Sequence, residues 1–189
     1  MMKNIAIFAS GSGSNAENIV NYFRAKKSAE VKLILSNNKN AGVIERSNRL
    51  KIPCVIFDRK AFYETDQIEK LLLETEIDLV VLAGFLWLIP ETLISLFPKK
   101  IINIHPALLP DHGGKGFYGS AVHQAVLDTA SKKSGITVHY VNEKFDEGEI
   151  IFQATCDISE GETPVSLAEK IHQLEYTHFP KVIESVLNL

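Results

Sequence analysis

The chain has 189 residues, of which 46% are hydrophobic and 23% charged, and its formal net charge is −3. These values predict one folded domain over residues 1–189 and exclude a largely disordered chain or a coiled coil. The slightly acidic balance argues against a nucleic-acid-binding surface. The longest apolar run, residues 79–89, is too short for a membrane-spanning helix of about 20 residues. With only two cysteines and no recognisable signal sequence, we expect a cytoplasmic protein.

Strand-like runs alternate with helix-length amphipathic segments along most of the chain. Strands are predicted at residues 4–9, 31–35, 54–57, 78–83 and 101–105, and helices at residues 14–27, 41–50, 61–74 and 91–97. The last third predicts a helix at 119–130, two consecutive strands at 135–141 and 150–155 that pair antiparallel, and a helix at 164–186 that Pro180 should kink or break. This order predicts an α/β fold: a single open, mostly parallel, twisted sheet with helices on both faces and an antiparallel strand near the C-terminal edge.

A glycine-rich loop, residues 10–16 (SGSGSNA), joins the first strand to the first helix. Open α/β sheets bind ligands at such positions, and a helix N-terminus offers free N–H groups to an anion. The loop also fits G-x-G-x-x-A, but the second strand ends in Ser36-Asn37-Asn38 without the acid of a dinucleotide fold, and no Walker lysine follows the glycines. We therefore favour a single phosphate or similar anion here. The alternative is a tight turn that needs glycine only for its geometry.

Asn103 and His105 lie two residues apart at the end of the fifth predicted strand, so their side chains share one face of the sheet. An amide can bind a developing oxyanion, and an imidazole can move a proton near neutral pH. Asp146, in the turn that follows the next strand, is a candidate partner that would raise the pKa of His105. The alternatives are a capping Asn, a buried core His and an ordinary surface turn. His139 is interpreted as a packing residue or an outer hydrogen-bonding group.

Other catalytic patterns are missing from the sequence. It contains no H-E-x-x-H string, no cysteine pair with metal-ligand spacing and no G-x-S-x-G elbow. We therefore expect no bound metal and no hydrolase triad.

Taken together, six segments in order resemble the folate-dependent phosphoribosylglycinamide formyltransferases over almost the whole chain. They are FASGSGSN (8–15), LAGF (82–85), INIHPALLP (102–110), GITVHYV (135–141), FDEGEII (145–151) and HQLEYTHFP (172–180). The resemblance implies a Rossmann-like formyltransferase fold. It also implies transfer of the formyl group of 10-formyltetrahydrofolate to the amine of glycinamide ribonucleotide, in de novo purine (IMP) biosynthesis.

The resemblance also assigns residues to roles. It makes Asn103, His105 and Asp146 catalytic. It implies that the ribonucleotide is bound by Gly13, Ser14, Asn15, His172, Gln173, Leu174 and Glu175. It implies that the folate is bound by Arg59, Leu86, Trp87, Leu88, Ile89, Asn103, Asn142, Glu143, Lys144, Phe145 and Asp146. The sequence departs from the family pattern at Leu86-Trp87, where Met-Arg is common, and in the loop 111–120, which is longer than usual.

Two related families share the Asn-x-His and Asp signature. Methionyl-tRNA formyltransferases add a C-terminal tRNA-binding domain, and formyltetrahydrofolate hydrolases add an N-terminal regulatory domain; we expect neither here. A non-catalytic folate- or nucleotide-binding module is the alternative from another class. The expected partners are small-molecule substrates, without nucleic acid or membrane, and the expected state is a monomer or weak homodimer.

Overall fold

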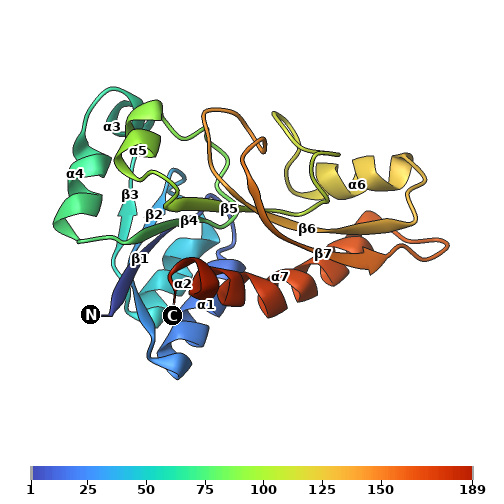
Figure 1. The fold of residues 1–189 in the computed structure, drawn as a ribbon, viewed down its shortest axis with the longest axis horizontal. Coiled ribbons are helices and arrows are strands. Elements are labelled where there is room, and N and C mark those ends of the chain that lie inside the picture. The colour runs from blue at the N-terminus through green and yellow to red at the C-terminus, as the bar shows by residue number, and fades with distance from the viewer. Residues whose placement is uncertain (1, 189) are drawn as a thin grey trace.

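The structure, a computed structural model, describes residues 2–188. Within these residues one seven-stranded sheet has the order β3-β2-β1-β4-β5-β6-β7 (Figure 1). The strands are β1 (Lys3–Phe8), β2 (Ala29–Ser36), β3 (Cys54–Ile56), β4 (Leu79–Leu82), β5 (Ile101–His105), β6 (Lys133–Tyr140) and β7 (Ile150–Asp157). The helices are α1 (Ser14–Lys26), α2 (Gly42–Leu50), α3 (Arg59–Tyr63), α4 (Gln67–Glu74), α5 (Glu91–Leu96), α6 (Ser120–Asp128) and α7 (Pro164–Val186).

The strand directions confirm the predicted fold class. Strands β1 to β5 pair in parallel, whereas β6 pairs antiparallel with both β5 and β7. After β1 the chain builds outward through β2 and β3, and then returns to the other side of β1 to form β4. The connections after β1 and β4 therefore leave the sheet in opposite directions, which opens a crevice at the carboxyl ends of these strands.

The parallel strands β1, β2, β4 and β5 are buried on both faces over most of their length, which explains their nearly continuous apolar runs. One face packs against α1, α2 and α7 through a core that includes Ile7, Phe23 and Phe179. The other face packs against α3, α4 and α5 around Phe8 and Leu72. Figure 1 shows the two groups of helices on opposite sides of the sheet. Because this frame is packed on both sides, the loops at its carboxyl edge are held by rigid strands.

Two expectations about helices were wrong, namely a single helix over residues 61–74 and a break at Pro180. The predicted helix 61–74 is two helices, α3 and α4, and α3 begins earlier than predicted because Asp58 caps it by accepting a hydrogen bond from the Ala61 N–H at 2.8 Å. Helix α7 is continuous through Pro180. A proline there leaves the carbonyl of Tyr176 without its helical donor, and the Asn18 side-chain amide donates to that carbonyl at 3.0 Å. This bond from α1 compensates the lost helical one.

Candidate active site

A cavity of about 790 Å³ lies at the carboxyl ends of β1, β4 and β5. Its wall combines the glycine-rich loop after β1, the segment after β4, the end of β5 and the turn before β7. Most of the predicted site residues line it. They are Gly13, Ser14, Asn15, Arg59, Leu86, Trp87, Leu88, Asn103, His105, Phe145, Asp146, His172 and Glu175. Segments distant in the sequence therefore meet at the edge where the parallel sheet predicted a site.

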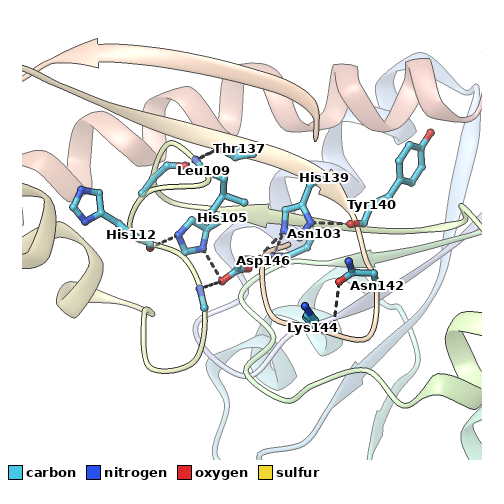
Figure 2. Close-up of polar contacts among 12 residues, drawn as sticks. Asn103, His105, Leu109, His112, Thr137, His139, Tyr140, Asn142, Lys144 and Asp146 are labelled. Atoms are coloured by element: carbon cyan, nitrogen blue, oxygen red, sulfur yellow. Dashed lines mark hydrogen bonds and ion pairs between the residues drawn. The ribbon is translucent and has the colours of Figure 1, made fainter. Parts of the chain in front are cut away.

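Asn103 is positioned by the antiparallel register of β5 and β6, which places it directly opposite His139. Its Nδ2 lies 3.1 Å from His139 Nε2 and 3.3 Å from Asp146 Oδ1 (Figure 2). His139 Nδ1 donates to the Tyr140 carbonyl at 2.8 Å, so the neutral ring accepts a hydrogen bond at Nε2. The Asn103 amide thus donates to both neighbours, and His139 is the outer hydrogen-bonding group that the sequence suggested.

His105 is almost fully buried, with 3% of its surface exposed. Its Nε2 donates to the His112 carbonyl at 2.8 Å, and its Nδ1 lies 3.5 Å from Asp146 Oδ2 (Figure 2). A carbonyl can only accept, so the ring proton of neutral His105 belongs on Nε2. The unprotonated Nδ1 then faces a carboxylate oxygen. A single proton gained by this pair would be held between the two.

The pKa of His105 differs from the sequence-based expectation. Burial lowers it, and this effect exceeds the raising effect of the nearby Asp146 charge, so the pKa lies below its ordinary value. Burial by itself would raise the pKa of Asp146, but the nearby His139 and His105 and the hydrogen bond from the Gly114 N–H lower it overall. The resting pair is therefore a neutral imidazole beside an ionised carboxylate.

The backbone holds Asp146 toward the cavity. Its φ is 56°, a left-handed conformation that Asp adopts more readily than most residues. Its Oδ2 accepts a hydrogen bond from the Gly114 N–H at 3.0 Å. The loop 111–119 thus contacts both members of the pair, through the His112 carbonyl on His105 and the Gly114 N–H on Asp146.

Polar side chains from α1 and α7 form the end of the cavity beside the glycine-rich loop. The Asn15 side-chain amide donates to Glu175 Oε2 at 2.8 Å, while the buried Asn15 Oδ1 has no partner among the described residues. Glu175 is 6% exposed. Burial raises its pKa, although the bond from Asn15 and the neighbouring His172 act in the opposite direction. The unpartnered Asn15 oxygen leaves an acceptor available to a ligand.

Aromatic side chains form the opposite end. Trp87 packs against Phe57, Phe62 and Phe85 at ring-centroid distances of 5.9, 5.9 and 6.4 Å. The Arg59 guanidinium lies 4.9 Å above the centre of the Trp87 ring. This end therefore offers an apolar surface bordered by a cation, which suits a flat heteroaromatic ligand with an acidic tail.

Six predicted binding residues do not line the cavity. Helical spacing places His172 and Glu175 on the same face of α7, so Gln173 and Leu174 point elsewhere, and Leu174 packs on the core. Ile89 is buried in the core between the sheet and helices α3, α4 and α5. The other three residues lie in the turn between β6 and β7. There the Asn142 side chain accepts a hydrogen bond from the Lys144 N–H, and Glu143 is exposed. The Lys144 side chain forms an ion pair with Glu147 at 3.0 Å.

One buried polar residue of the cavity wall, His123 on α6, is not among the predicted site residues. It is 4% exposed, lines the cavity, and its Nδ1 has no partner among residues 2–188. Burial lowers its pKa, and the nearby His172 and His105 lower it further. A single His on an amphipathic helix gives no local signal of this role, because only packing shows which wall it joins.

Within residues 2–188, no group of three or more His, Cys, Asp or Glu side chains is arranged to hold a metal ion. In the same part of the chain no helix has the length and apolar character needed to cross a membrane.

The model of the formyl transferase family matches residues 3–183. A phosphoribosylglycinamide formyltransferase of Bacillus subtilis is 39% identical over all of this chain and 96% of its own length. A chloroplastic one of Arabidopsis thaliana is 37% identical over 97% of this chain, which spans 65% of that protein's length. The crystal structure of glycinamide ribonucleotide transformylase 1 from Geobacillus kaustophilus superposes with a TM-score of 0.90 at 37% identity, covering 99% of this chain and all of that one. The chain belongs to the formyl transferase family.

Proposed function

We propose that this chain transfers the formyl group of 10-formyltetrahydrofolate to the amine of glycinamide ribonucleotide, a step of de novo purine biosynthesis. The observation that carries the proposal is a single cavity with three chemically distinct parts. A glycine-rich loop forms one end, the aromatic and cationic surface forms the other, and Asn103, His105 and Asp146 lie in its wall. The names of the related enzymes support the same reaction.

The ribonucleotide would bind at the loop end. The backbone of Gly13, Ser14 and Asn15 at the start of α1 suits its phosphate, because helix N-termini attract anions. The Asn15 Oδ1 and the Glu175 carboxyl suit the hydroxyl and amide groups of the rest of the molecule. The folate would bind at the end formed by Arg59, Trp87 and their neighbours, with Leu86, Leu88 and Phe145 against its ring system.

The transfer joins the amine nitrogen to the formyl carbon, gives the formyl oxygen a negative charge, and then breaks the bond from carbon to the folate nitrogen. The amine loses a proton and the folate nitrogen gains one, so protons and charge balance. Folate supplies the formyl group and leaves as tetrahydrofolate.

His105 can serve both needs of this reaction. Its Nε2–H would donate to the oxyanion once the substrate displaces the His112 carbonyl. The amine proton would be taken up by the pair formed by the Asp146 carboxylate and the unprotonated Nδ1, which lie 3.5 Å apart, and the carboxylate would stabilise the resulting imidazolium. Asn103 would keep this carboxylate in place through its bond to Oδ1, and would reach the oxyanion only by giving up a present hydrogen bond.

A single-turnover experiment tests the proposal. The protein is mixed with 10-formyltetrahydrofolate, with and without glycinamide ribonucleotide, and tetrahydrofolate is followed. We expect tetrahydrofolate to form only with the ribonucleotide present, together with an equal amount of formylated product. Release at the same rate without it would indicate a hydrolase, and no release in either case would indicate a binding module.

The cytoplasmic location, the absence of a metal requirement and the monomer or weak homodimer stay predictions.

A further inference from the structure

Helix α2 contacts the glycine-rich loop but contributes no residue to the described cavity wall. The Val43 N–H donates to the Gly11 carbonyl at 3.1 Å, and Arg46 Nε donates to the Ser12 carbonyl at 2.8 Å. Arg46 itself does not line the cavity, whereas Gly11, Ser12 and Gly13 do. Two consecutive carbonyls of the loop are therefore directed at α2.

This arrangement fixes where the amide hydrogens point. The peptide bonds here are trans, so each N–H points opposite to the carbonyl of the preceding residue. The N–H groups of Ser12 and Gly13 are thus directed away from α2. Among the hydrogen bonds found in residues 2–188, neither N–H is a donor. They are left available to a ligand of the cavity.

The peptide between Ser12 and Gly13 needs a restraint to keep this direction. Glycine reaches both signs of φ with little cost, so a peptide plane beside it can turn over. A turned peptide would present the Ser12 carbonyl, instead of the Gly13 N–H, to an anion in the cavity. The Arg46 bond to that carbonyl opposes the turn.

Arg46 is held in place by an acid on the neighbouring helix. Its guanidinium pairs with Glu17 of α1, which also pairs with Arg49 at 2.5 Å. The hydrogen bond from Arg49, together with the one from Arg46, lowers the pKa of Glu17 despite an opposing effect of burial, so the acid is ionised at neutral pH. The side chain of Arg46 is 31% exposed and that of Arg49 is 56% exposed. Arg49 shares the acid, but among the hydrogen bonds of residues 2–188 it has none to the loop.

We infer that Arg46 is a positioning residue for the substrate phosphate, acting by holding the peptide between Ser12 and Gly13 with its N–H toward the cavity. The inference deepens the proposed function and rests on its assignment of the loop to the phosphate. Arg46 does not touch the phosphate in this account. Its contribution should therefore appear in phosphate affinity and not in the chemical step.

The test compares Arg46→Met, which keeps the aliphatic stem and removes the donors, with Arg49→Met as the matched control. Binding of ribose 5-phosphate is measured by calorimetry, a readout that needs no formyl transfer. We expect Arg46→Met to weaken binding about tenfold, the loss typical of one removed hydrogen bond. We expect Arg49→Met to bind within about twofold of the parent, as for a change at an exposed ion pair.

Steady-state kinetics separate positioning from general damage. For Arg46→Met we expect a higher KM for the ribonucleotide, with kcat and the KM for folate unchanged. Glu17→Gln, which frees the Arg46 guanidinium while leaving its donors, should give a smaller rise. If Arg46→Met melts well below the parent, Arg46→Lys, which keeps the charge but lacks the Nε donor, replaces it in both assays.

Each outcome separates the inference from the function on which it rests. If the parent binds ribose 5-phosphate and Arg46→Met binds it equally well, the inference is overturned and the phosphate site stands. An equal loss for Arg46→Met and Arg49→Met would show a structural clamp and also overturn it. If the parent does not bind ribose 5-phosphate, the phosphate assignment fails and the inference fails with it. Loss for Arg46→Met alone supports it.

Discussion

Replacing Gly13 by Ala should destabilise the fold, because this position has no room for a β-carbon. Gly13 precedes α1 with φ at 76°. A Cβ there would lie 2.4 Å from Val43 Cγ2 and 2.7 Å from the Val43 Cα. Rotation of the Val43 side chain cannot relieve the second contact, since it involves backbone. The left-handed backbone costs about 1–2 kcal/mol for a residue with a side chain, and overpacking costs about 1–3 kcal/mol.

The sum, about 2–5 kcal/mol, is a large part of the roughly 5–15 kcal/mol that stabilises a typical domain. At about 2–4 °C per kcal/mol for a domain of this size, the Tm should fall by roughly 4–20 °C. Gly11 provides the matched control, because a Cβ built there meets nothing within 4 Å. Gly11→Ala should keep the Tm of the parent and raise the KM for the ribonucleotide, since Gly11 lines the cavity.

The close contact between Val43 and a Cβ at position 13 changes the expected effect of a side chain at Gly13. From the sequence, a side chain such as that of Val at Gly13 should block the approach of the anion. The structure shows that it would first strike Val43.

Thermal unfolding followed by circular dichroism measures both variants, and Val43→Ala is combined with Gly13→Ala as a partial rescue. The double variant should recover the part of the loss caused by the contact with Cγ2, whereas the contacts with the Cβ and Cα of residue 43 and the backbone strain should remain. If Gly13→Ala melts within about 2 °C of the parent, less than the shift expected for 1 kcal/mol, the packing argument is refuted.

Three further outcomes are expected. Asp146→Asn should lower kcat by about 10²-fold or more, which is the size of a lost acid–base contribution. The same variant should shift the NMR titration of His105 to still lower pH, because it removes the nearby negative charge. An unmoved titration would show that the pair is not electrostatically coupled. Burial raises the pKa of Glu175 in the folded chain. The protonated carboxyl therefore contributes to the free energy of unfolding at low pH, and this contribution is lost as the pH rises through the raised pKa. Glu175→Gln, which can still accept from Asn15, should therefore raise the Tm at pH 8 and lose this advantage near pH 4; a gain independent of pH would contradict the burial argument. Exhaustive chelation should leave kcat unchanged, and a loss restored by zinc would show that a metal ligand set was overlooked.

The sequence by itself determined the sheet, most of the elements and the residue types of the site. Apolar strand runs and amphipathic helices are local signals, since each depends on the spacing of neighbours within one element. They located β5 at residues 101–105 and α7 at 164–186 with the bounds found in the structure. The alternation along a strand also placed Asn103 and His105 on one face. The six motifs also suggested the family whose model matches residues 3–183.

The tertiary structure decided what these residues do to one another. The contact of Asn103 with His139 depends on the register between β5 and β6, which local sequence does not specify. The lowered pKa of His105 results from burial, a property of everything packed around it, and it reverses the expectation drawn from Asp146 alone. The restraint of the loop by Arg46 likewise joins segments 34 residues apart. Such effects depend on distance and solvent exclusion in the folded chain, and these exist only once distant segments have packed together.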